Sequence, residues 1–149
     1  MARELQSDIE INAPAERVWG VLTDFESFPQ WNPFITLLKG EAKVGSRLEV
    51  RIAPPGGRAM TFKPTVQTVE PNREFRWLGR VGVPGLFDGE HIFEITPIGD
   101  GKVRLVQRER FTGVLAPLLL RMVGDGTRQG FDAMNRALKE RAEATSQTT

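Results

Sequence analysis

Pro117–Ala144 has the sequence PLLLRMVGDGTRQGFDAMNRALKERAEA, whose apolar residues recur at the spacing of an α-helix. Proline suits the first turn, because its ring fixes φ and its missing N–H would have no partner there. On a helical wheel, a stripe about 100° wide contains Leu120, Val123, Thr127, Phe131, Met134 and Leu138. The charged residues fall opposite. We therefore predict a long C-terminal helix with one buried face and one solvated face.

Three glycines, Gly124, Gly126 and Gly130, interrupt this helix. Each costs about 1 kcal/mol relative to alanine in a helix interior. Gly124 and Gly130 flank the apolar stripe, where a missing side chain permits either close approach of a neighbouring element or space for a ligand. Both explanations stay open at this point.

The composition favours a single domain over residues 1–149, with a frayed tail at 145–149. The 20 lysines and arginines nearly balance 19 aspartates and glutamates, so the formal net charge is +1 and we expect no nucleic-acid partner. The absence of cysteine excludes thiolate ligands, and one histidine argues against a His-rich zinc site. We expect no metal and no cofactor.

The first residues, Met1–Asp8, lack the apolar core of a signal peptide, and no apolar run approaches membrane-spanning length. We expect a soluble, cytoplasmic protein without stable membrane insertion. The oligomeric state stays open, with a homodimer as one alternative.

Alternation of apolar and polar residues predicts a first strand over Leu5–Ile11. Pro14 then opens a short amphipathic helix, and Pro29 and Pro33 limit a second short helix near Asp24–Trp31. Period-two alternation predicts further strands near residues 35–39, 47–53, 59–69, 73–80, 90–96 and 102–111. Short connections rich in glycine and proline join these strands as successive hairpins. The result is an antiparallel sheet of about seven strands, whose buried face the C-terminal helix covers.

Four segments carry a resemblance to a known superfamily. They are Ile11–Trp19 (INAPAERVW), Trp31–Phe34 (WNPF), Gly89–Glu94 (GEHIFE) and Arg108–Gly113 (RERFTG). With the element order, they resemble the helix-grip fold of the SRPBCC superfamily, which includes START lipid-transfer domains, the pollen-allergen group and polyketide cyclase/dehydrase-like proteins. The resemblance implies an α+β fold, with a curved antiparallel sheet around a long C-terminal helix and two short helices after the first strand. It also implies an apolar cavity between sheet and helix for lipids, polyketides, hormones or other hydrophobic molecules.

The last predicted hairpin carries the only histidine. Alternation places His91 on the inner face of one strand, and Gln107 and Glu109 on the inner face of the next. A three-residue loop, with Gly101 in the left-handed conformation, sets His91 opposite Glu109, whereas a five-residue loop from Pro97 sets it opposite Gln107. A carboxylate within hydrogen-bond reach would orient the ring as general acid–base catalysis requires. We favour the other use of such a pair, which is to orient a ligand.

Aromatic and apolar residues complete the predicted site. Trp31 and Trp77 each offer a large apolar surface, to the core or to a cavity. The predicted ligand-binding residues are Trp31, Trp77, Phe87, His91, Phe93, Gln107, Glu109, Gly130, Phe131 and Met134. Apolar side chains in two turn-rich segments, residues 82–88 and 114–119, predict either a gate over the cavity or a hydrophobic contact surface. The gate residues are Val83, Leu86, Phe87, Leu115 and Leu118.

Several motifs are excluded by their context. Gly124–Gly130 lies inside a helix and lacks the lysine of a phosphate-binding loop. Glu90 and Glu94 alternate away from His91, so these side chains cannot converge on one metal ion. No Gly-x-Ser-x-Gly elbow is present for a serine nucleophile.

The sequence favours a protein that binds a hydrophobic small molecule for transfer, storage or sensing. The first alternative is an aromatase/cyclase-like enzyme acting on a polyketide, with His91 and Glu109 as the acid–base pair, although the chain has no tyrosine as a proton donor. A further alternative is an interaction module, with Leu86, Phe87, Leu118 and Met122 as its contact surface.

Overall fold

The computed structural model describes residues 3–83 and 85–145. Its elements are, in order, β1 (Arg3–Ile11), α1 (Ala15–Thr23), η1 (Phe25–Ser27), α2 (Phe28–Trp31), β2 (Ile35–Lys39), β3 (Glu49–Ile52), β4 (Met60–Phe62), β5 (Thr65–Glu70), β6 (Glu74–Val81), β7 (Phe87–Gly99), β8 (Lys102–Thr112) and α3 (Ala116–Thr145). The predicted order of a strand, short helices, more strands and one long helix is confirmed. Thr145 still belongs to α3, and the rest of the predicted tail, residues 146–149, lies outside the described residues.

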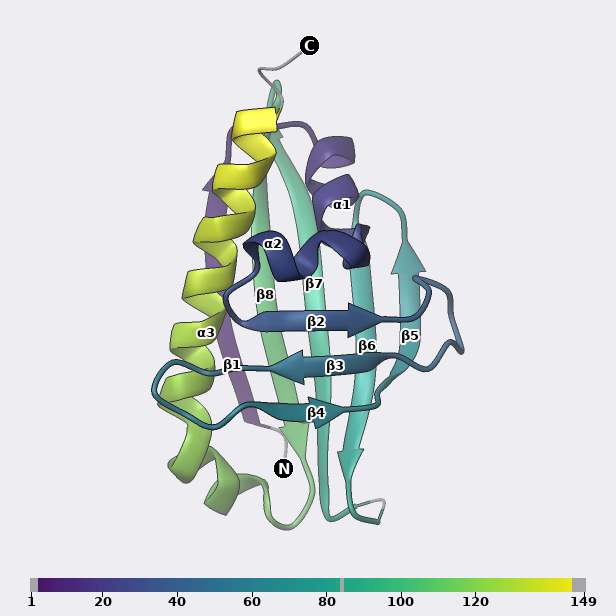
Figure 1. Ribbon diagram of the computed structural model, residues 1–149, viewed down its shortest axis with the longest axis vertical. Coiled ribbons are helices and arrows are strands. Elements are labelled where there is room, and N and C mark those ends of the chain that lie inside the picture. Colours follow the sequence, from purple (N-terminus) through teal and green to yellow (C-terminus); the bar gives the residue numbers. More distant parts are fainter. Residues whose placement is uncertain (1–2, 84, 146–149) are drawn as a thin grey trace.

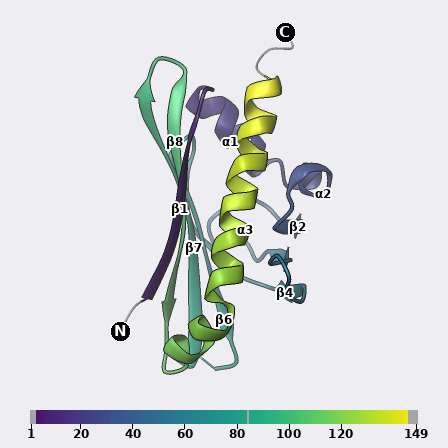
Figure 2. The same ribbon diagram turned by 90° about the vertical axis from the view of Figure 1, so that its left-hand side faces the viewer.

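Two antiparallel sheets build the fold. Five strands follow the order β1-β8-β7-β6-β5, and three short strands follow the order β2-β3-β4. In Figure 1 the short strands cross in front of the long ones. Figure 2 shows that α3 and the three-stranded sheet lie on the same side of the five-stranded sheet. This is the α+β helix-grip architecture that the sequence predicts.

The strand predicted for residues 59–69 is wrong in one respect, because it divides into β4 and β5 in different sheets. Lys63 and Pro64 lie between the two strands. Proline has no N–H to donate to a sheet ladder, so the chain leaves the small sheet there and enters the large one. The predicted series of hairpins is interrupted at this point, and over residues 3–83 and 85–145 the two sheets contain five and three strands.

Aromatic residues fill the space between the five-stranded sheet and the short helices. Phe75 and Phe93 on the inner face of the sheet have ring centroids 6.4 Å apart, and Phe25 of η1 stacks on Phe75 at 5.8 Å. The buried residues of α1 are Val18, Val21 and Leu22. These side chains belong to the hydrophobic core, and the short helices lie in the upper half of Figure 1.

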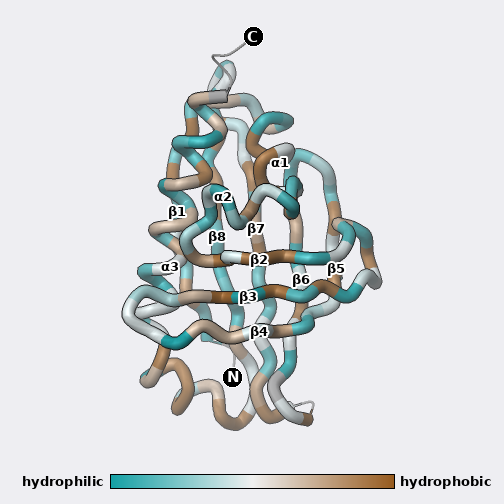
Figure 3. The backbone as a smooth tube through the Cα atoms, viewed as in Figure 1, coloured by the Kyte–Doolittle hydropathy of each residue, from teal (hydrophilic) through white to brown (hydrophobic). Residues whose placement is uncertain are grey.

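The long helix α3 packs on β1 and buries Phe131, Met134 and Leu138. Its N-terminal half differs from the prediction, since Val123 is 47% exposed although it belongs to the predicted stripe. The physical reason is that this half borders an open space instead of the core, as described below. Figure 3 shows the hydrophobic first turns of α3 at the lower end of the molecule.

The outer face of the five-stranded sheet is charged. Arg76 pairs with Glu74 and Glu90, and Arg108 pairs with Glu94 at 2.9 Å. The hydrogen bond from Arg76 to Glu74 raises the pKa of the arginine. Since this face is solvated, the space for a ligand lies on the inner face. Among the helices of the described residues, none combines the length and apolar character needed to cross a membrane.

Candidate functional site

A cavity of about 460 Å³ lies between the lower parts of β6, β7 and β8, the three-stranded sheet and the N-terminal half of α3. Small-molecule sites usually have volumes of about 300–1,000 Å³. The small sheet and its loops contribute apolar side chains from Phe34, Val50, Ile52, Pro54, Met60 and Phe62. The large sheet contributes Trp77, Phe87 and Phe111, and α3 contributes Met122 and Val123.

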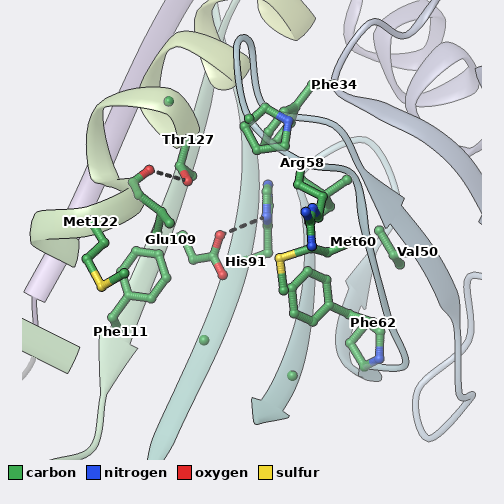
Figure 4. Close-up of a pocket in the computed structure, with 18 of the residues that line it drawn as sticks. Phe34, Val50, Arg58, Met60, Phe62, His91, Glu109, Phe111, Met122 and Thr127 are labelled. Carbon is green, nitrogen blue, oxygen red and sulfur yellow. Dashed lines mark hydrogen bonds and ion pairs between the residues drawn. The ribbon is translucent and has the colours of Figure 1, made fainter. Parts of the chain in front are cut away.

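Polar side chains also reach the wall, from Arg58, His91, Glu109 and Thr127. Figure 4 shows His91 and Glu109 pointing toward one another, with Arg58 on the loop between β3 and β4. The Thr127 hydroxyl is already used, because it donates to the carbonyl of Val123 at 2.9 Å. Over residues 3–83 and 85–145, no cluster of three or more His, Cys, Asp or Glu side chains could hold a metal ion.

The register of the β7–β8 hairpin places His91 directly opposite Glu109. Gly99 pairs with Lys102, so the connection is a two-residue turn at Asp100 and Gly101, and Gly101 has a φ of +65°. The register shifts between Pro97 and Gly99. This bulge takes up one residue, so the turn is shorter than the predicted three-residue loop but gives the register that such a loop would give.

His91 contacts both Gln107 and Glu109, the residues that the two alternative registers placed opposite it. Its Nε2 lies 2.9 Å from Gln107 Oε1, and its Nδ1 lies 3.5 Å from Glu109 Oε1. The second distance suits an ion pair but is long for a hydrogen bond. The ring is fully buried and packs between Phe93 and Trp77, with centroids 4.6 Å and 4.9 Å away. Its position is therefore fixed by packing as well as by polar contacts.

Two glycines form the floor of the cavity beside Glu109. Gly79 pairs with Gly89 across β6 and β7, on the inner face. A Cβ added to Gly89 would lie 2.5 Å from Glu109 Oε2, so the carboxylate occupies the place of a side chain. A Cβ at Gly79 would meet nothing nearer than Pro64 Cβ at 3.7 Å. Gly79 therefore leaves space for the cavity, and Gly89 leaves room for the Glu109 carboxylate in the cavity wall.

The helix glycines divide between the two explanations left open by the sequence. A Cβ added to Gly130 would overlap the ring of Phe34, so Gly130 permits close packing. Gly126 borders the cavity, where an added Cβ would make an ordinary contact with Pro54 at 3.6 Å. Neither role could be assigned before the partner of each helix face was known.

Four of the predicted ligand-binding residues line the cavity, namely Trp77, Phe87, His91 and Glu109. The others lie outside its wall: Trp31, Phe93, Gln107, Gly130, Phe131 and Met134. Phe93, Gln107, Phe131 and Met134 are buried in the core, and Trp31 packs edge-on against Phe28 at 5.2 Å. The cavity does not extend up the sheet as far as these residues, because the aromatic side chains of η1 and α2 fill the space above His91.

The two predicted gate segments lie side by side. Val114 N donates to Gly85 O at 3.1 Å, and Leu115 N donates to Leu86 O at 3.0 Å. Phe87 belongs to β7 and stacks on Phe111 at 5.5 Å, so it is part of the wall and not of a loop. The other predicted gate residues, Val83, Leu86, Leu115 and Leu118, do not line the cavity. Their gating role stays a prediction.

The sequence reasoning missed several wall residues. Gly79 and Gly89 carried a usable signal, since a glycine inside a strand pattern often marks a close approach of another group. Arg58 carried none, because it lies on a loop whose position depends on the crossing of the two sheets. Phe34 and Phe62 resemble ordinary core residues in the sequence.

Comparison with known proteins supports the architecture. The model of a protein family described as "Polyketide cyclase / dehydrase and lipid transport" matches residues 2–143. No curated protein matches the chain. The Zhui aromatase/cyclase from Streptomyces sp. R1128 has a TM-score of 0.79 at 16% identity, covering 96% of this chain and 94% of that one.

Two further solved structures are similar. Norcoclaurine synthase from Thalictrum flavum has a TM-score of 0.74 at 16% identity, with 98% and 97% of the two chains covered. A START superfamily protein from Mycobacterium smegmatis has a TM-score of 0.71 at 24% identity, with 95% and 98% covered. At these identities the similarity establishes the fold.

Proposed function

Because the chain belongs to the polyketide cyclase/dehydrase and lipid transport family, we propose that it binds a hydrophobic small molecule in the cavity, for transfer, storage or sensing. The family description covers enzymes and carriers alike, so the site has to decide between them. The observation that carries the proposal is the cavity of about 460 Å³ with a mostly apolar wall.

The chemistry of the wall favours an apolar ligand with few polar groups. Removing apolar surface from water contributes about 25 cal/mol per Å², before the costs of association are subtracted. Trp77 and Phe111 present aromatic side chains, and the flexible thioethers of Met60 and Met122 adapt to irregular shapes. Glu109 provides a polar anchor among them, which fixes orientation more than it adds affinity.

A fluorescence titration with the apolar probe anilinonaphthalene sulfonate tests this proposal. We expect saturable binding to the wild-type protein. Gly79→Leu places a side chain in the cavity and should weaken probe binding by about tenfold or more, which corresponds to about 1.4 kcal/mol. Gly20→Leu is the matched control, because Gly20 lies on the exposed side of α1 with no atom within 4 Å of an added Cβ. Equal affinities of the two variants would refute binding in this cavity.

A second candidate is acid–base catalysis on such a ligand. The observation that favours it is the facing of His91 Nδ1 and Glu109 Oε1 at 3.5 Å in the wall. A carboxylate there could remove a proton from a carbon next to a ketone, which is a step of aldol chemistry. The test is deuterium exchange into the ketone probe tetralone. We expect an exchange rate above that of buffer, reduced about a hundredfold in Glu109→Gln and unchanged in Glu70→Gln on the surface. A wild-type rate equal to buffer would reject this candidate for such ketones.

A further inference from the structure

A line of hydrogen bonds runs from His91 through the core to the surface. Gln107 Oε1 lies 2.9 Å from His91 Nε2, and Gln107 Nε2 donates to Asn135 Oδ1 at 2.8 Å. Asn135 Nδ2 donates to Ser7 Oγ at 3.1 Å, and Ser7 Oγ donates to Asp132 Oδ1. His91, Gln107 and Asn135 are no more than 1% exposed, whereas Asp132 is exposed on α3. The line therefore links the cavity wall to a surface carboxylate.

The carboxylate at the surface end sets the direction of every bond in the line. An ionised aspartate accepts hydrogen bonds only, so the single proton of the Ser7 hydroxyl is committed to Asp132. Ser7 must then accept from the amide NH₂ of Asn135, which turns the Asn135 oxygen toward Gln107. Gln107 in turn presents its oxygen to His91, so His91 Nε2 must carry a proton. The reverse direction would set a serine lone pair against the carboxylate.

This direction has a consequence at the other ring nitrogen. His91 Nδ1 is buried, and among the described residues no group makes a hydrogen bond to it. Glu109 Oε1 faces it at 3.5 Å. With Nε2 as the protonated nitrogen of the line, Nδ1 is the ring nitrogen left on the side of Glu109 and the cavity.

We propose that Asp132 acts through Ser7, Asn135 and Gln107 to hold His91 with Nε2 protonated, so that Nδ1 is the ring nitrogen left facing Glu109. Asp132, Ser7, Asn135 and Gln107 are positioning residues in this proposal. None of these four lines the cavity. The inference rests on the hydrogen-bond line and needs no ligand, so its failure and the failure of the proposed function are separate results.

The test uses the fact that the chain has one histidine. Protein labelled with ¹⁵N-histidine gives imidazole nitrogen signals from His91 alone, and their chemical shifts report which nitrogen carries a proton. We expect the wild-type Nε2 to have the shift of a protonated nitrogen. In Asp132→Asn the new amide can donate to Ser7, which permits the reversed direction, so a measurable fraction of Nε2 should lose its proton to Nδ1. Ser7→Ala should have the same effect, and Ser7→Thr, which keeps the hydroxyl, should resemble the wild type.

Asp125→Asn is the matched control, because Asp125 is exposed on the same helix and belongs to no part of the line. Its imidazole spectrum should equal that of the wild type. An unprotonated Nε2 in the wild type would overturn the proposal. So would an Asp132→Asn spectrum identical to that of the wild type, or an equal shift in the Asp125→Asn control.

Discussion

Gly130 lies where α3 crosses Phe34, and an added Cβ would overlap the phenyl ring. Overpacking of a core costs about 1–3 kcal/mol, so Gly130→Ala should lower the free energy of unfolding. The gain of about 1 kcal/mol that alanine brings to a helix interior offsets part of this cost, which leaves a net loss of up to about 2 kcal/mol. Gly124→Ala is the control, since its nearest neighbour would be Leu120 Cδ2 at 4.0 Å, and it should raise stability. Urea unfolding of both variants measures the difference, and a stabilised Gly130→Ala would contradict the packing role.

The position of a single side chain was predictable where alternation along a strand decides which face of the sheet it lies on. The inward position of His91 and its two polar neighbours followed from period two alone. The register did not, because a bulge next to Pro97 is invisible in the pattern. Ser7 also fell on the inward face of the first strand, but its role depends on Asn135 and Asp132, which are more than a hundred residues away. No local spacing connects such residues.

At the scale of elements, the C-terminal end of α3 is fastened to the segment after β1. Glu143 accepts hydrogen bonds from Lys139 Nζ at 2.5 Å and from Asn12 N at 2.8 Å, and these bonds lower the pKa of its carboxyl below the usual 4.5. A carboxyl whose pKa is lowered by folding stabilises the folded state at a pH above its unfolded-state pKa. This stabilisation is lost as the pH falls through the pKa of the folded state. Glu143→Gln should cost about 0.5 kcal/mol at neutral pH, because partial exposure screens the pair.

The pH dependence checks this assignment. The stability difference between the wild type and Glu143→Gln should shrink between a neutral and an acid pH, because protonation of the wild-type carboxyl at the acid pH removes its advantage over the amide. Urea unfolding at both pH values measures it. Glu140→Gln, an exposed change on the same helix, should show no such trend. A difference that grows toward acid would have the wrong sign for a lowered pKa.

Elements were predictable in type and order, and less so in what each one faces. Periodicity located α3 and its stripe, yet the half containing Val123 borders the cavity and only the half from Phe131 to Leu138 enters the core. Residues 59–69 divide at Pro64 into strands of two different sheets. The proline alone does not predict this division, because an edge strand can contain a proline without ending there. Pairing between distant strands is a property of the whole chain.

In the molecule as a whole, the aromatic core and the cavity lie at different levels of the five-stranded sheet. Aromatic side chains from η1 and α2 fill the space over Phe75 and Phe93, whereas Gly79 leaves space over the lower strands. The sequence predicted a hollow between sheet and helix but not which end would be open. That choice depends on the depth to which the short helices insert, and on the small sheet that crosses the large one (Figure 1).

Native mass spectrometry of the purified protein tests the central claim most directly, because a hydrophobic ligand in the cavity adds its own mass to that of the chain. We expect the wild type to carry a non-covalent small molecule that organic solvent releases. Gly79→Leu should carry less of it, and Gly20→Leu as much as the wild type. A wild-type spectrum that shows only the mass of the polypeptide, before and after addition of an apolar probe, would contradict small-molecule binding.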